Sequence, residues 1–352
     1  MSAEALMTTK DLTVSFPVRR DGRKLIMQAL RGVDIELRAG ETLGLVGESG
    51  SGKSTLARAL LRLIPSEGAI TLDGRDVSGI SAREFRRERR RIQMVFQDPY
   101  SSLNPSLTVG QSIMEPLKVH TRMNAEQRAA RVSEVLELVG LSADHAQRYP
   151  DEFSGGQRQR VAIARAITLD PDVLVCDEAV SALDVSTQNQ VINLLEDLRA
   201  RTGLAYLFIS HDLGVVRHIS DRVAVMYLGE IVEEGPVGRV YDAAAHPYTQ
   251  VLLNAVPVAD PEVQRKKSGL VLRGDTPDPA NPPSGCAFST RCPMAMPMCS
   301  TTPPPAVEIP GGGTARCHLH LEGPKLAGAP VKTLLGEPEP VLPNAPVAAA
   351  SR

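Results

Sequence analysis

The sequence contains no tryptophan, and aromatic residues make up only 3% of its 352 positions. Neither sign of charge is in excess, because 39 Lys and Arg face 41 Asp and Glu for a formal net charge of −2. This balance argues against binding nucleic acid through bulk electrostatics, since such domains are usually strongly basic. The longest apolar runs, such as 223–228, have the length of a strand and fall short of the roughly 18–20 apolar residues of a membrane span.

Cysteine is also scarce, with five in the whole chain, which excludes a disulfide scaffold. Residues 1–10 have no apolar core of the kind found in signal peptides, so we expect the chain to stay in the cytosol. Apolar residues, in contrast, reach 42%, which is ordinary for a globular protein. The length suggests about two domains.

Strand and helix patterns alternate over the first two thirds of the chain, which predicts an α/β fold. Strands are expected at 12–18, 33–37, 42–46, 69–72, 92–96, 173–176, 205–209 and 222–228. Helices are expected at 53–63, 125–141 and 191–198, where apolar residues recur at helical spacing. No strand pattern occurs within about 104–155, so this segment is predicted to be a helical insert.

A phosphate-binding loop is predicted where the strand 42–46 meets the following helix. Residues Gly47 to Ser54 fit G-x-x-x-x-G-K-[ST], a loop whose main-chain N–H groups surround phosphates at a helix N-terminus. Lys53 is expected to reach the β- and γ-phosphates, Ser54 to ligate Mg²⁺, and Thr55 to contact the α-phosphate. The candidate nucleotide-binding residues are Gly47, Ser49, Gly50, Ser51, Gly52, Lys53, Ser54 and Thr55.

Two adjacent carboxylates end the apolar strand at 173–176. Asp177 is placed to hold Mg²⁺ through water, and Glu178 to polarise an attacking water as general base. Side chains of neighbouring strand residues point to opposite faces, but the chain can turn both toward one site where the strand ends.

A glycine pair marks a second helix start, at Ser154, Gly155, Gly156 and Gln157. Ser154 and Gln157 satisfy a capping box, so an ordinary helix N-terminus is one interpretation. The other is a second anion-binding site, with the glycines allowing close approach of phosphate. Two chains arranged head to tail could each lend this site to the nucleotide of the other.

These motifs together resemble the ATP-binding subunit of an ABC transporter, a P-loop α/β fold with an antiparallel β subdomain and an inserted helical subdomain. The resemblance implies a domain over 8–256, with the insert at 104–155. It also implies ATP and Mg²⁺ as ligands and hydrolysis with Glu178 and His211 as catalytic residues. Further residues implied to contact nucleotide or Mg²⁺ are Phe16 (adenine), Gln97 (Mg²⁺), the signature residues Ser154, Gly155, Gly156 and Gln157, and Asp184.

Three segments narrow the resemblance to the oligopeptide/dipeptide importer ATPases. They are 96–105, 246–249 with 255–257, and the pair Ala179-Val180. This pair stands where the family more often has Pro-Thr, and it is similar to the F-type subunit of these importers. That family implies a sister ATPase in a heterodimer, two transmembrane permease subunits and an extracytoplasmic substrate-binding protein. It also implies peptide uptake, a place at the cytoplasmic face of the membrane, and no nucleic acid.

Two alternatives stay open at this point. A soluble ABC ATPase of DNA repair or translation usually has two ATPase cores in one chain or a long insert, and this chain has one set of motifs and a short insert. A regulatory nucleotide-binding module with little turnover is disfavoured by the intact Glu178 and His211.

Four of the cysteines gather late in the chain, at Cys286, Cys292, Cys299 and Cys317. Their spacing lacks the short pairs of structural zinc sites, so zinc, a [4Fe–4S] cluster, unliganded thiols and disulfides all stay open on the residues alone. The resemblance favours the [4Fe–4S] cluster over Zn²⁺, in an extension over 257–321. Cys176 is expected to be a buried strand residue, His318 and His320 surface residues, and 322–352 a disordered tail.

Overall fold

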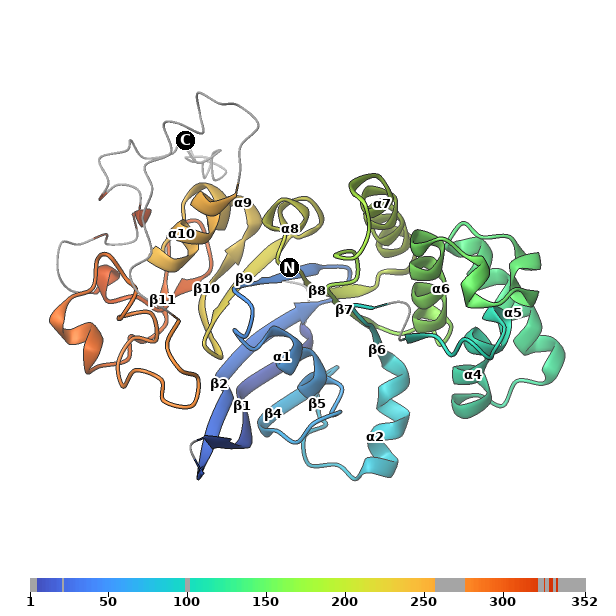
Figure 1. Ribbon diagram of the computed structural model, residues 1–352, viewed down its shortest axis with the longest axis horizontal. Helices are drawn as coiled ribbons and strands as arrows, with labels where there is room; N and C mark the ends of the chain where they lie inside the picture. Colours follow the sequence, from blue (N-terminus) through green and yellow to red (C-terminus); the bar gives the residue numbers. More distant parts are fainter. Residues whose placement is uncertain are drawn as a thin grey trace, which may run out of the picture. The chain divides into compact units, whose positions relative to one another are not determined.

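The computed structural model describes residues 5–20, 22–98, 102–256 and 276–321, together with Leu326, Ala329–Val331 and Leu334. The chain divides into two compact units. Figure 1 labels their helices and strands. The first unit contains Met1–Leu12, Asp34–Gly44 and Ser54–Asp212, and the second contains Thr13–Val33, Leu45–Lys53 and Leu213–Arg352. Within the described residues, no helix is both long and apolar enough to cross a membrane.

A parallel sheet forms the centre of the first unit, in the order β3, β8, β7, β6. Its strands are β3 (Thr42–Val46, whose first three residues lie in this unit), β8 (Ala205–Ile209), β7 (Val173–Asp177) and β6 (Ile92–Val95). Every residue of β7 and β8 is buried, as expected for apolar runs covered on both faces. The register pairs Cys176 with Phe208 and Val95, so Asp177 and Glu178 emerge at the carboxyl edge of the sheet.

The first unit also contains part of an antiparallel sheet, with the order β2, β1, β4, β5. Its strands are β1 (Ala5–Arg20), β2 (Arg23–Arg38), β4 (Glu67–Leu72) and β5 (Arg75–Asp76), of which the unit takes residues 5–12 and 34–38 of the first two. Helices α1 (Lys53–Leu60) and α2 (Ala82–Glu88), followed by the short helix η1 (Arg89–Arg91), accompany it.

The predicted insert folds as helices, and no strand occurs among its described residues. They are α4 (Val109–His120), α5 (Ala125–Leu138), the short helices η2 (Ala143–Gln147) and η3 (Pro150–Glu152), and α6 (Gly155–Ile167). Capping boxes at Thr108, Asn124 and Ser154 fix where α4, α5 and α6 begin. Helix α7 (Val185–Thr202) ends at Gly203, whose φ of 71° suits the glycine.

The second unit contains a sheet that the end of the chain extends. Its order is the last residues of β3, then β9 (Arg222–Tyr227), β10 (Glu230–Pro236), β12 (Thr314–Ala315) and β11 (Val307–Glu308). The pairs β9–β10, β10–β12 and β12–β11 are antiparallel. The helices of this unit are α8 (Leu213–Ile219), α9 (Val237–Asp242), α10 (Pro247–Ala255), η4 (Pro297–Ser300) and η5 (His318–His320). Because β12 pairs with β10, the cysteine-bearing extension is hydrogen-bonded to the sheet that precedes it.

Two findings, one in the extension and one in the predicted tail, differ from the sequence-based predictions. His318 is only 3% exposed and its Nε2 lies 2.8 Å from the Thr302 carbonyl oxygen, so its prediction as a surface residue is wrong. In the segment expected to be a disordered tail, Leu326 and Val331 are buried and pack with Cys317 and Leu319. Residues 99–101 of the predicted family segment 96–105, residues 257–275 and most of the tail lie outside the described residues.

Candidate functional site

The phosphate loop of the second unit has a backbone that only glycine can supply. Gly47 has φ of 154°, and a Cβ there would lie 2.2 Å from the Met226 carbonyl oxygen. Gly52 has φ of 111°, and its Cβ would lie 2.7 Å from the carbonyl oxygen of Ala29. The loop is therefore drawn closely against neighbouring main chain, which is the geometry that the motif predicts.

Lys53 closes this loop on itself. Its side chain is buried, and its Nζ donates to the carbonyl oxygens of Gly47 (2.8 Å) and Glu48 (2.9 Å). The ammonium group therefore lies inside the loop, where phosphate oxygens would be received. Phe16, the expected adenine contact, is half-buried on β1 in the same unit.

Two oxygen ligands suited to Mg²⁺ meet in the first unit. Ser54 begins the part of α1 that belongs to this unit, and its hydroxyl donates to Oδ1 of Asp177 at 3.0 Å. Asp177 is buried at the end of β7. A hydroxyl and a carboxylate at this separation fit Mg²⁺, which prefers oxygen ligands and keeps several waters.

Glu178 turns away from the strand through a left-handed backbone. Its φ is 51°, uncommon for a residue with a side chain, and its N–H donates to the Ile209 carbonyl oxygen at 3.0 Å. Its Oε2 accepts from Nε2 of Gln97 at 2.8 Å and lies 3.5 Å from Nδ1 of His211. Backbone strain of this kind is frequent at functional sites. Here the strained residue, Glu178, contacts two other predicted site residues, Gln97 and His211.

The signature residues form a helix start with a complete capping box. The Ser154 hydroxyl accepts from the Gln157 N–H at 3.3 Å, and the Gln157 side chain accepts from the Ser154 N–H at 3.0 Å. A Cβ on Gly156 would lie 2.2 Å from Cγ2 of Thr187, so this glycine lets α6 approach α7. A Cβ on Gly155 would only reach ordinary contact, 3.6 Å from Leu183.

Asp184 caps the next helix, α7. Its carboxylate accepts from the Ser186 hydroxyl and from the N–H and hydroxyl of Thr187. These hydrogen bonds, led by the one from Ser186, hold the pKa of Asp184 below its usual value. The carboxylate therefore has a structural role beside the nucleotide contact that the resemblance implies.

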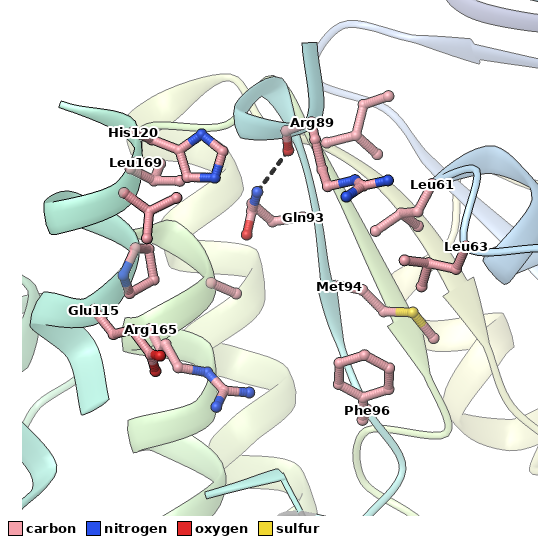
Figure 2. A pocket seen from close by; sticks show the side chains of 14 residues that line it. Leu61, Leu63, Arg89, Gln93, Met94, Phe96, Glu115, His120, Arg165 and Leu169 are labelled. Atoms are coloured by element: carbon pink, nitrogen blue, oxygen red, sulfur yellow. Dashed lines mark hydrogen bonds between the residues drawn. The ribbon is translucent and has the colours of Figure 1, made fainter. Parts of the chain in front are cut away.

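A pocket of about 370 Å³ opens in the first unit beside β6 (Figure 2). Its wall includes Leu63, Phe96 and Val119, which are large apolar side chains that remain exposed. Arg89 and Arg165 add positive charge, and Gln93 donates to the Arg89 carbonyl oxygen at 2.6 Å. Exposed apolar groups gathered in a hollow are typical of a protein-binding site.

The four late cysteines are free thiols and lie buried or half-buried. Burial raises the pKa of Cys286 to about 11 and that of Cys292 and Cys317 to about 12 each. No three His, Cys, Asp or Glu side chains of the described residues are arranged to hold a metal ion. Neither zinc nor an iron–sulfur cluster is therefore evident from ligand geometry. Cys176 is buried on β7, as predicted.

Comparison with known families matches two parts of the chain. Residues 30–181 match the family described as ABC transporter, and residues 232–299 match the oligopeptide/dipeptide transporter C-terminal region. The fold and the loop geometry thus define an ABC transporter ATP-binding protein.

Two relatives are similar to the chain over nearly their full length. The putative oligopeptide transport ATP-binding protein YkfD of Bacillus subtilis (strain 168) is 51% identical over 301 residues, 85% of this chain and 92% of the relative. The oligopeptide transport ATP-binding protein AppF of the same organism is 50% identical over 322 residues, which are 90% of this chain and 98% of the relative. The chain belongs to the oligopeptide/dipeptide transporter family of ABC ATP-binding proteins.

A solved structure agrees with this assignment. It is the dimeric structure of a post-hydrolysis state of the ATP-binding cassette MJ0796 bound to ADP and Pi. The TM-score is 0.59 at 31% sequence identity, and the match covers 66% of this chain and 98% of the MJ0796 chain. The predicted fold class and ATPase activity are confirmed. The transport relatives do not favour the alternative of a soluble ATPase in DNA repair or translation.

Proposed function

We propose that this chain hydrolyses ATP to drive uptake of peptides through partner membrane subunits, at the cytoplasmic face of the membrane. The observation that carries the proposal is the group of Glu178, Gln97 and His211 at the end of β7, one residue beyond the Mg²⁺-suited Asp177. Peptide as substrate rests on the transport relatives, two of which are described as oligopeptide transport ATP-binding proteins.

The residues divide the reaction between binding and proton transfer. The phosphate loop and Lys53 bind the triphosphate, with Phe16 against the adenine and Thr55 at the α-phosphate. Ser54, Asp177 and Gln97 would hold Mg²⁺, which supplies positive charge to the β- and γ-phosphates. Glu178 accepts a proton from the attacking water, and His211 contacts the γ-phosphate.

The signature residues act on the nucleotide of another ATPase chain. Ser154 and Gln157 cap the start of α6, and Gly155 and Gly156 between them present main-chain N–H groups there, where an anion is favoured. ATP drives closure because it binds the closed pair better than the open one. The second chain is a sister ATPase, so the pair is a heterodimer. Asp184, the residue that caps α7, would contact nucleotide in the same pair.

The pocket beside β6 receives a short helical segment of a permease subunit, and two such subunits form the pore. Phe96 lines the pocket, and the next residue, Gln97, donates to Glu178. A segment seated on Phe96 would therefore shift a residue bonded to the general base. A substrate-binding protein delivers the peptide from outside the cell.

The cysteine group holds a [4Fe–4S] cluster in this proposal, with Zn²⁺ as the alternative. A main-chain N–H near each sulfur can donate to a thiolate. These groups belong to Phe288, Met294, Met296 and Leu319. The ligands of a cubane cluster bind four separate iron atoms, so they stand wider apart than the ligands of one zinc ion. A bound cluster would supply the positive charge that keeps these buried thiols ionised.

Turnover and binding of the purified chain test the ATPase roles. Glu178→Gln should keep MgATP affinity while lowering hydrolysis by about 10²–10⁴-fold, because it removes the base. Lys53→Ala should lose MgATP binding. Near-normal turnover in the first variant, or normal affinity in the second, would contradict these roles.

Two further measurements test transport and the cluster. The chain co-expressed with its permeases and reconstituted in vesicles should take up labelled peptide only with ATP, and should co-purify with a different ATPase chain. Anaerobic purification should give visible absorbance and about four irons per chain, as the cluster's formula requires. One zinc and no iron would overturn the cluster assignment.

A further inference from the structure

Arg291 of the cysteine-bearing extension reaches the phosphate loop. Its side chain is 7% exposed, and its Nη1 donates to Oε2 of Glu48 at 2.7 Å. The guanidinium also lies 3.4 Å from the Tyr227 hydroxyl, at Nη1, and 5.9 Å from the centre of that ring. Although burial opposes the charged form, the hydrogen bonds with Glu48 and Tyr227 raise the pKa of Arg291. Arg291 is therefore a buried, charged donor that hydrogen-bonds Glu48, the residue after Gly47.

Tyr248 holds the main chain of the same residue. Its hydroxyl accepts from the Glu48 N–H at 2.8 Å. Its ring packs on Tyr227 at 4.6 Å between centres and on Phe288 of the extension at 5.3 Å. Glu48 is thus fixed at its side chain by the extension and at its backbone by α10.

Helix α10 is itself anchored by a buried ion pair. Glu233 and Arg239 pair with side-chain exposures of 0% and 2%. The Glu233 carboxylate also accepts the N–H groups of Ala245 and His246, each at 2.8 Å, just before α10 begins. The loop is also bonded at Ser51, whose carbonyl oxygen accepts from the Gly229 N–H at 2.8 Å. The loop is therefore held by main chain at Ser51 and by Tyr248 and Arg291 at Glu48.

The charge of Glu48 gives these contacts a role in binding. A carboxylate in a phosphate-binding loop repels the phosphates, and the repulsion grows with their charge. Arg291 offsets this charge in a setting with little exposure to screening solvent. Removing the guanidinium would both release the loop and leave the carboxylate uncompensated.

We infer that Arg291 is a positioning residue for nucleotide binding, which acts through Glu48 to keep the phosphate loop in its binding shape. The extension thereby sets the ATP affinity of the ATPase core. The inference rests on the proposed function, because it assigns the loop to ATP.

Nucleotide affinity of the full chain tests this inference. Arg291→Gln should raise the Kd and KM for MgATP by about tenfold, as loss of a charge-assisted hydrogen bond predicts, with kcat within about twofold. The loss should be larger for MgATP than for MgADP. The double variant Arg291→Gln with Glu48→Gln should regain most of the affinity, because two amides can hydrogen-bond without leaving a charge. Arg217→Gln, which breaks the exposed pair with Asp242 in the same unit, is the matched control and should bind as wild type.

Hydrogen exchange of the loop amides provides a readout that needs no nucleotide. Residues 47–53 should exchange faster in Arg291→Gln and in Tyr248→Phe than in the wild type, with unchanged iron content. Unchanged exchange and affinity in Arg291→Gln, or an additive loss in the double variant, would overturn the inference. Failure of the wild-type chain to bind MgATP would instead overturn the proposed function, and the exchange experiment would still decide the role of Arg291.

Discussion

The phosphate loop and the signature are both glycine-rich helix starts, yet their glycines are needed for opposite reasons. Gly47 and Gly52 have positive φ and would collide with backbone if they carried a Cβ. Gly155 and Gly156 lie inside α6, after a serine that caps the helix, and neither has a positive φ. The loop needs its glycines in order to fold, whereas no contact of Gly155 with the described residues requires a glycine.

This contrast indicates how each site would bind phosphate. A loop closed by Lys53 and braced by main chain is a complete binding site within one chain. A capped helix start with an open glycine can offer N–H groups to an anion, which in the proposed function is the nucleotide of another chain. The difference is therefore consistent with two chains that share each nucleotide.

The largest effect is expected from Gly47→Ala. The new Cβ would meet the Met226 carbonyl oxygen at 2.2 Å, so the loop must open. MgATP binding should fall by about 100-fold or more, as expected if several phosphate contacts are lost. Isothermal titration with MgATP would measure it, and retention of wild-type affinity would contradict the account of the loop.

Gly155→Ala is the matched substitution at the signature. Alanine fits a helix at this position, so the melting temperature should stay level or rise slightly. MgATP binding to the single chain should be unchanged, while ATPase activity of the assembled pair should fall by about tenfold through loss of close approach to phosphate. Equal losses of binding in both glycine variants would erase the contrast.

Acid is expected to have the smallest effect on the phosphate loop itself, because it acts through His246, the residue that caps α10. Burial, reinforced by nearby His320, lowers the pKa of His246 to about 3 in the folded chain. Since the unfolded value is about 6.5, the unfolded state binds the proton first, and stability present above pH 6.5 is lost as the pH falls toward 3. Between pH 7.5 and 5.0 the loss should be about 2 kcal/mol.

The variant His246→Gln should flatten this dependence, since its amide oxygen can still accept the Tyr248 N–H. Melting temperatures at the two pH values would measure the effect. His218→Gln, which changes an exposed histidine of the same unit, serves as the control. If stability depends on pH in His246→Gln as it does in the wild type, groups other than His246 cause the acid sensitivity.

Sequence reasoning succeeds where a contact is local in the chain. The strands 42–46 and 205–209 were predicted at their observed bounds, because each is an apolar run between turn residues. The capping box of Ser154 and the glycines of the loop are short motifs of the same kind.

Long-range contacts and backbone strain are not accessible in this way. Arg291 and Glu48 are 243 positions apart, and no periodic pattern connects them. The left-handed φ of Glu178 follows from the β7–β8 register, which also gives its N–H the Ile209 carbonyl as acceptor. His318 was expected at the surface, but it is 3% exposed and its Nε2 lies 2.8 Å from the carbonyl oxygen of Thr302, 16 positions away.

The Val331 N–H donates to the Ala244 carbonyl oxygen at 2.8 Å, so the folded part of the chain extends at least to Val331. This contact limits how far the C-terminus can be deleted without damage to the fold. A deletion placed by composition after Leu321 would remove two buried side chains, Leu326 and Val331, and expose Cys317 beneath them. A phenotype from such a deletion would report damage to the fold as readily as loss of a tail. Truncation series on this chain should therefore begin beyond Val331 and work inward.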